Sequence, residues 1–169
     1  MAPPSDHPTS DDHTPGDTAL SDSVSLRIAA PASKLYDLVS DISQMGRLSP
    51  ECTGGKWLDG ATGPAAGARF KGSNKRGIAR WSTTNTVVAA EPGRKFSFRT
   101  KDSGTEWSYS FADDGDGTIV TESRSEWAPR PLLAKVFSTL LLGGIKEHDD
   151  EMRAGMRATL ERLRSLAEG

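Results

Sequence analysis

Short segments in which polar and apolar residues alternate fill the sequence from Gly54 to Trp127, and clusters of Gly, Pro, Asp and Ser separate them. An alternation with a period of two predicts strands with one buried and one solvated face, and the clusters predict tight turns. Antiparallel strands are the kind that tight turns can join, so we expect an antiparallel meander. Its six strands are predicted at residues 56–59, 68–73, 80–88, 95–100, 106–111 and 118–127.

Helical patterns flank this meander on both sides. Before it, a strand with the same alternation is predicted from Ser23, with Val24, Leu26 and Ile28 on its buried face, and two short helices follow Pro31. The first helix has apolar residues at helical spacing, at Leu35, Leu38, Val39 and Ile42, and the second contains Met45 and Leu48. After the meander, a long helix to about Ala167 has one apolar face, formed by Ile145, Met152, Met156, Leu160, Leu163 and Leu166.

All these apolar faces are buried together if the sheet curves around the last helix. The fold class predicted from the residues is therefore α+β, with a curved antiparallel sheet of about seven strands wrapped around a long C-terminal helix. The concave space between sheet and helix is where we expect a pocket.

The chain divides into an acidic tail over residues 1–22 and a folded domain over residues 23–169. The tail is rich in Pro, Asp, Ser and Thr, holds five aspartates and no Lys or Arg, and has little to bury, so we expect it to be disordered. His7 and His13 fall within it, and we expect no metal site. The remaining residues hold 18 acids against 21 bases, so the formal charge of +3 is too small to indicate a nucleic-acid-binding protein.

Other classes are excluded by what the sequence lacks. Cys52 is the only cysteine, so no intramolecular disulfide can form and a reducing compartment fits best. The N-terminus has no secretory signal pattern and no run of apolar residues is long enough to span a bilayer, so we expect a cytoplasmic protein. No glycine motif leads from a strand into a helix in the way that nucleotide phosphates require, and no cofactor is expected.

Four stretches carry a resemblance to a known family: residues 27–41 (RIAAPASKLYDLVSD), 48–52 (LSPEC), 90–94 (AEPGR) and 117–122 (GTIVTE). With the order of the elements, they resemble the START-like or SRPBCC superfamily, and within it the polyketide cyclase/dehydrase and lipid-transport group. The resemblance covers about Ser23 to Ala167. It implies the helix-grip fold and an internal pocket for a small hydrophobic molecule, and none of the four stretches is a catalytic signature.

Hairpin register sorts the predicted sheet into two faces. If Phe98 points inward, the partner positions across the turns place Trp107, Tyr109, Glu122 and Arg124 on the same side, with Trp107 opposite Glu122. The other face is then polar throughout, and Ser97 belongs to it. With the apolar face of the last helix, the predicted ligand-binding residues are Trp81, Thr83, Asn85, Phe98, Trp107, Tyr109, Glu122, Arg124, Met152 and Met156.

These residues also have plainer interpretations. The aromatic side chains either line a pocket or fill a solid core. Glu122 and Arg124 either form a structural ion pair, or Arg124 binds a carboxylate or carbonyl of a ligand while Glu122 orients it. Glu122 and His148 are the candidate acid and base if the protein is an enzyme, and His148 is otherwise an ordinary surface or core histidine.

The apolar segment from Leu132 to Leu142, followed by Gly143 and Gly144, has three interpretations: a lid over the pocket, a packed helix, or a surface for transient membrane contact. The first functional hypothesis is binding or carriage of a small hydrophobic molecule such as a lipid, polyketide or aromatic acid. The second is an enzyme similar to a polyketide cyclase or dehydratase. The third is a regulatory module that docks a partner protein through the segment from Leu132 to Leu142.

Overall fold

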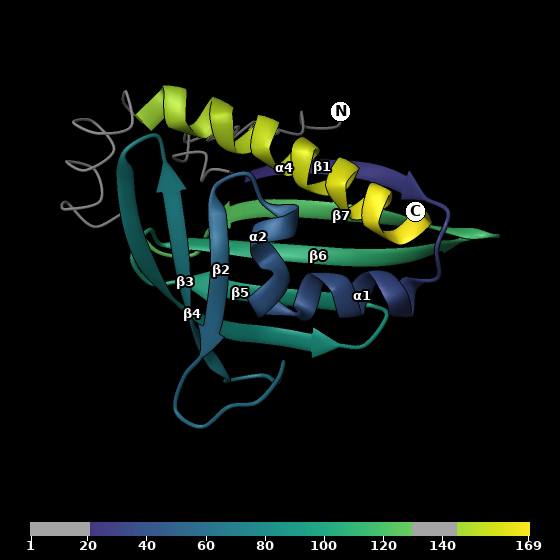
Figure 1. Ribbon diagram of the computed structural model, residues 1–169, viewed down its shortest axis with the longest axis horizontal. Helices are drawn as coiled ribbons and strands as arrows, with labels where there is room; N and C mark the ends of the chain where they lie inside the picture. The colour runs from purple at the N-terminus through teal and green to yellow at the C-terminus, as the bar shows by residue number, and fades with distance from the viewer. Residues whose placement is uncertain (1–20, 130–144) are drawn as a thin grey trace, which may run out of the picture.

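The computed structural model describes residues 21–129 and 145–169, without the side chains of residues 145–149. Seven strands form one sheet, and the helices lie on one of its faces (Figure 1). The elements are β1 (Ser21–Ile28), α1 (Ala32–Ser40), the 3-10 helix η1 (Ile42–Gln44), α2 (Met45–Leu48), β2 (Cys52–Trp57), β3 (Arg69–Arg76), β4 (Ala79–Glu91), β5 (Lys95–Thr100), β6 (Thr105–Asp114), β7 (Gly117–Glu126) and α4 (Ile145–Glu168).

The strand order in the sheet is β1-β7-β6-β5-β4-β3-β2, and each neighbouring pair is antiparallel. The first strand therefore pairs with the last, and the remaining strands follow one another as a meander. Figure 1 shows the sheet curving, with α4 running along the side of β1 and β7. The predicted α+β helix-grip architecture, with a seven-stranded curved sheet and a long C-terminal helix, is confirmed.

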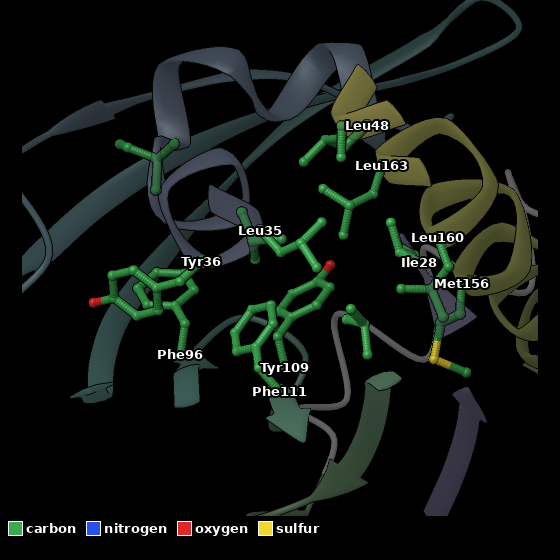
Figure 2. Packing of buried hydrophobic residues seen from close by; sticks show 14 of the residues in the cluster. Ile28, Leu35, Tyr36, Leu48, Phe96, Tyr109, Phe111, Met156, Leu160 and Leu163 are labelled. Carbon is green, nitrogen blue, oxygen red and sulfur yellow. The ribbon is translucent and has the colours of Figure 1, made fainter. Parts of the chain in front are cut away.

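Both ends of the domain contribute to one hydrophobic core. Pro31, with φ −68°, precedes the first turn of α1, and the helix buries Leu35, Tyr36 and Val39. From α4, Leu160 and Leu163 are fully buried. Figure 2 shows Leu35 and Tyr36 of α1 and Leu160 and Leu163 of α4 around the aromatic residues of β5 and β6. The helical spacing thus identified Leu35 and Val39 of α1 and Leu160 and Leu163 of α4 as buried, whereas Ile42 belongs to η1 and the buried Tyr36 was not predicted.

The β6–β7 hairpin differs from its predicted register by two residues. Asp114 and Gly117 are partners, so the turn contains only two residues, and Gly115 takes a φ of 69° that favours glycine. Trp107 consequently lies opposite Arg124 rather than Glu122, and Tyr109 lies opposite Glu122. Because side chains alternate with a period of two, this slip leaves every residue on its predicted face.

Three further details correct the sequence analysis. β1 begins at Ser21 rather than Ser23, so Asp22 belongs to the sheet. β2 begins at Cys52 rather than at residue 56, because the strand continues through Gly54 and Gly55 with a register shift between Cys52 and Gly54. Ser97 is fully buried, although the analysis placed it on the solvated face; it lies on β5, which has neighbouring strands on both sides.

Candidate functional site

A cavity of about 200 Å³ lies between the inner face of the sheet and the helices α2 and α4. α4 packs against β1 and β7, and residues of β3, β4 and α2 complete the cavity wall. The cavity wall includes every residue predicted to bind a ligand: Trp81, Thr83, Asn85, Phe98, Trp107, Tyr109, Glu122, Arg124, Met152 and Met156. The structure thus brings all ten together, and their ligand-binding role stays a prediction.

Much of this wall is aromatic or sulfur-containing. Trp81 and Trp107 come from the sheet, and Met152 and Met156 face them from α4. Phe98 contributes to the wall and also packs edge-on against Phe70, with ring centroids 5.2 Å apart. Phe98 therefore has both of the roles that the sequence left open, core packing and cavity lining. Methionine side chains are flexible, so the α4 side of the cavity can adapt to different shapes.

The polar residues toward β3–β5 satisfy one another. The Thr100 hydroxyl donates to Asn85 Oδ1 at 2.7 Å, and Asn85 Nδ2 donates to Thr83 Oγ1 at 3.2 Å. Gly72 lies opposite Thr83, and an added Cβ there would approach Thr83 Oγ1 to 3.0 Å. A glycine is thus needed beside this hydrogen-bond network. The network fixes the amide group of Asn85 at the cavity wall.

Tyr109 and Glu122 form a buried polar pair in the wall. The Tyr109 hydroxyl donates to Glu122 Oε1 at 2.7 Å, and only 3% of Glu122 is exposed. Burial raises the pKa of Glu122 to about 8, and the hydrogen bond from Tyr109 opposes this rise. Burial and the neighbouring Glu122 also raise the pKa of Tyr109 well above its ordinary value. At neutral pH the pair therefore carries a neutral carboxylic acid and a neutral phenol.

Arg124 pairs with a residue that the sequence analysis placed in the tail. Its guanidinium donates to Asp22 Oδ2 at 2.6 Å, and the two side chains are 3% and 5% exposed. The more exposed Arg153 of α4 binds the other oxygen of Asp22. Burial alone would raise the pKa of Asp22, but hydrogen bonds and charges from Arg124 and Arg153 together hold it below the ordinary value of 3.8. This aspartate compensates the positive charge of Arg124.

Two ionisable residues at the cavity wall were absent from the sequence prediction, Glu51 and Cys52. The Glu51 backbone is fixed, because its N–H donates to Ser49 Oγ and its carbonyl accepts from the N–H of Lys75. Burial raises the pKa of Glu51 to about 7; Arg76 lowers it and Glu151 raises it further. Burial also raises the pKa of the Cys52 thiol, which makes the thiolate a minor form at neutral pH.

Some predicted features lie outside the described residues. These are residues 1–20 of the predicted tail with His7 and His13, the side chain of His148, and the segment from Leu132 to Leu142 with its glycine pair. Within residues 21–129 and 145–169, no cluster of three or more His, Cys, Asp or Glu side chains is arranged to hold a metal ion. No helix in that part of the chain has the length and hydropathy needed to cross a bilayer.

The fold and the cavity define a helix-grip protein with a hollow between sheet and C-terminal helix. Residues 21–168 match the family model described as polyketide cyclase/dehydrase and lipid transport, so the chain belongs to this family. A search of curated proteins finds no significant match.

Solved structures agree with this assignment. The polyketide-cyclase-like protein of Corynebacterium glutamicum is 31% identical, and the match covers 88% of this chain and 92% of that one with a TM-score of 0.58. The KanY protein is 18% identical over 90% of this chain and 100% of its own, with a TM-score of 0.66. The di-domain ARO/CYC StfQ from the steffimycin biosynthetic pathway is 14% identical over 89% of this chain and 51% of its own, with a TM-score of 0.67. The last two similarities concern the fold alone.

Proposed function

We propose that this protein binds a small, largely apolar molecule in the cavity between the sheet and α4. The observation that carries the proposal is the composition of the cavity wall, which combines tryptophan and methionine side chains with a few fixed polar groups. Ligand pockets have this composition, because apolar walls supply affinity and the polar groups set the orientation. The family to which the chain belongs supports the same function.

The size and surroundings of the cavity restrict the ligand. A space of about 200 Å³ is smaller than the pockets of drug-sized ligands, which measure about 300–1,000 Å³. We therefore expect a compact ring system or a single short chain rather than a two-chain lipid. Movement of the flexible Met152 and Met156 side chains would enlarge the space on the α4 side.

Native mass spectrometry of the purified protein tests for a bound apolar molecule, and thermal denaturation with added tetralin or α-tetralone tests whether a bicyclic probe binds. A ligand at about 100 times its dissociation constant stabilises the folded state by about 2.7 kcal/mol. The expected result is a raised melting temperature with at least one of the two probes.

A matched pair of variants at Gly155 of α4 ties this binding to the cavity. An added Cβ at Gly155 would lie 3.6 Å from Pro50 Cγ, which is ordinary contact, so alanine fits there. Leucine forms helices nearly as well as alanine but projects into the space beside Pro50. Gly155→Ala should therefore retain the thermal shift and Gly155→Leu should lose it. Equal shifts in both variants would place the probe elsewhere and contradict the proposal.

A second candidate is an enzyme that dehydrates a β-hydroxyketone. It is favoured by Glu51 and Glu122, two carboxyl groups in one cavity with pKa values of about 7 and about 8. A general base and a general acid that work near neutral pH need such values. In this scheme the Glu51 carboxylate takes the proton next to the ketone, and Glu122 gives its proton to the departing hydroxyl, so that water and an enone are formed.

Ultraviolet absorbance of the enone measures this reaction directly. The enzyme hypothesis expects turnover above the rate in buffer, with losses in both Glu51→Gln and Glu122→Gln. The exposed-face variant Glu106→Gln serves as the control, since Glu106 is paired with Arg99 away from the cavity. A wild-type rate equal to that of buffer would leave a binding protein as the remaining function.

A further inference from the structure

One of the two carboxyl oxygens of Glu122 has no hydrogen-bond partner among the described residues, and Glu122 is part of the cavity wall. Glu122 lies on β7 between Val24 of β1 and Tyr109 of β6, on the inner face of the sheet. The hydroxyl of Tyr109 occupies Oε1. Oε2 is buried and has no hydrogen-bond partner among the described residues, although Glu122 is part of the cavity wall. A buried polar atom without a partner is costly, and a bound molecule is one way to satisfy it.

The proton of the acid lies on this same oxygen. Burial favours the neutral form of a carboxyl group, and the pKa of Glu122 of about 8 keeps it protonated at neutral pH. Since Tyr109 already donates its hydrogen to Oε1, the carboxyl hydrogen belongs on Oε2. In this state Oε2 of Glu122 is a hydrogen-bond donor, and above the pKa of Glu122 it becomes an acceptor.

The charged groups around Glu122 make an anionic ligand unfavourable. Arg124, two residues along β7, is compensated by Asp22 of β1, which also binds Arg153 of α4. From the connection between α2 and β2, Glu51 contributes a partly ionised carboxyl group to the cavity wall, and Cys52 contributes a neutral thiol. A carboxylate entering this space would give up its hydration, and the buried cation that it would meet, Arg124, already has Asp22 as its partner, while the second cation on Asp22, Arg153, is 66% exposed.

We propose that Glu122 recognises the carbonyl oxygen of a neutral ligand through the hydrogen on Oε2, so that the cavity selects neutral ketones over carboxylates. This inference rests on the proposed binding function and names the class of ligand. Tyr109 acts as a positioning residue, because its hydrogen bond fixes which oxygen carries the proton. The competing assignment is the one expected from the sequence, in which Arg124 binds a carboxylate.

Three probes with one bicyclic skeleton separate these assignments: tetralin, α-tetralone and tetralin carboxylate. Isothermal titration calorimetry of the full chain gives their affinities below and above the pKa of Glu122. Below it, α-tetralone is expected to bind roughly three- to tenfold more tightly than tetralin, the equivalent of one hydrogen bond. This advantage should disappear above pH 8, because ionised Glu122 repels the carbonyl oxygen. The carboxylate should be the weakest ligand.

Variants assign the effect to one side chain. Glu122→Gln keeps a donor at the position of Oε2 but has no proton to lose, so its preference for α-tetralone should be independent of pH. Glu106→Gln, on the other face of the sheet, should behave like the wild type. Infrared difference spectra provide a readout independent of affinity: α-tetralone should shift a carboxylic acid C=O band that is absent in Glu122→Gln.

The contrary outcomes differ in whether they overturn the role of Glu122 alone or the binding function as well. If tetralin and α-tetralone bind equally at every pH, or the carboxylate binds most tightly, the assignment of Glu122 is overturned while the cavity keeps its binding function. If neither neutral probe binds, both the binding function and this inference are overturned.

Discussion

Glu122 should make the folded protein less stable as the pH rises. Its pKa is about 8 in the folded protein and close to its ordinary value of 4.5 when the chain is unfolded. Between these values the folded state binds more protons than the unfolded state, so stability falls with increasing pH, by up to about 1.4 kcal/mol per pH unit. The stability contribution is complete below pH 4.5 and is lost by pH 8, a total of about 5 kcal/mol.

Urea denaturation of the wild type and of Glu122→Gln, repeated across this pH range, measures the effect. Glutamine has nearly the same shape and can still accept the hydrogen bond from Tyr109, but it never ionises. The difference in unfolding free energy between the two proteins should therefore grow with pH in favour of the variant. Comparing the two cancels the titration of Glu51, which is present in both. Glu106→Gln removes a half-buried carboxylate on the other face of the sheet and should retain the pH dependence of the wild type. A difference that stays constant from pH 4.5 to pH 8 would refute the reasoning.

Two further predictions concern stability and are measured by the same denaturation. Asp22→Asn removes the carboxylate of a buried ion pair and should lower the free energy of unfolding by about 3–5 kcal/mol. Asp114→Asn, in an exposed pair, should lower it by less than about 1 kcal/mol. Equal losses in the two variants would contradict the argument from burial. Gly46→Ala should lower the free energy of unfolding by about 1–3 kcal/mol, because the added Cβ would lie 2.6 Å from the carbonyl oxygen of Thr53. Gly63→Ala, with open space around it, should leave stability nearly unchanged. An unchanged stability of Gly46→Ala would contradict the close approach of α2 and β2.

The sequence predicted the faces of the sheet better than its register. Trp107, Tyr109, Glu122 and Arg124 were assigned to one face, and all four line one cavity. The reason is the period of two: a slip of two residues in the β6–β7 hairpin changes the partners and leaves the faces intact. The partners decide the chemistry, however, because the slip is what places Glu122 beside Tyr109.

Asp22 was assigned to the tail because the acidic composition of residues 1–22 was given more weight than the alternation of buried and exposed positions in the first strand. Its acidic neighbours upstream suggested a solvated segment, yet Asp22, Val24 and Ile28 continue one alternation and are all buried. A buried Arg124 also requires an anion nearby, which was a second signal for a partner. The burial of Asp22 could therefore have been predicted from the sequence.

Glu51 had no such signal. It lies between Pro50 and the start of β2, outside any periodic segment, and reaches the cavity only because α2 packs against β2. Its pKa is raised by burial among residues distant in the sequence and by Glu151, and Arg76 opposes this rise. Periodicity assigns residues to faces of one element, and it carries no information about how a loop is positioned by tertiary packing.

A crystal structure of the protein grown with α-tetralone below pH 8 tests the central claim most directly. We predict that the bicyclic ring lies between Trp107 and Met156, with the ketone oxygen about 2.5–3.0 Å from Glu122 Oε2, the length of an O–H···O hydrogen bond. A probe bound on the outer face of the sheet, or a ketone oxygen directed at Arg124 instead, would contradict it.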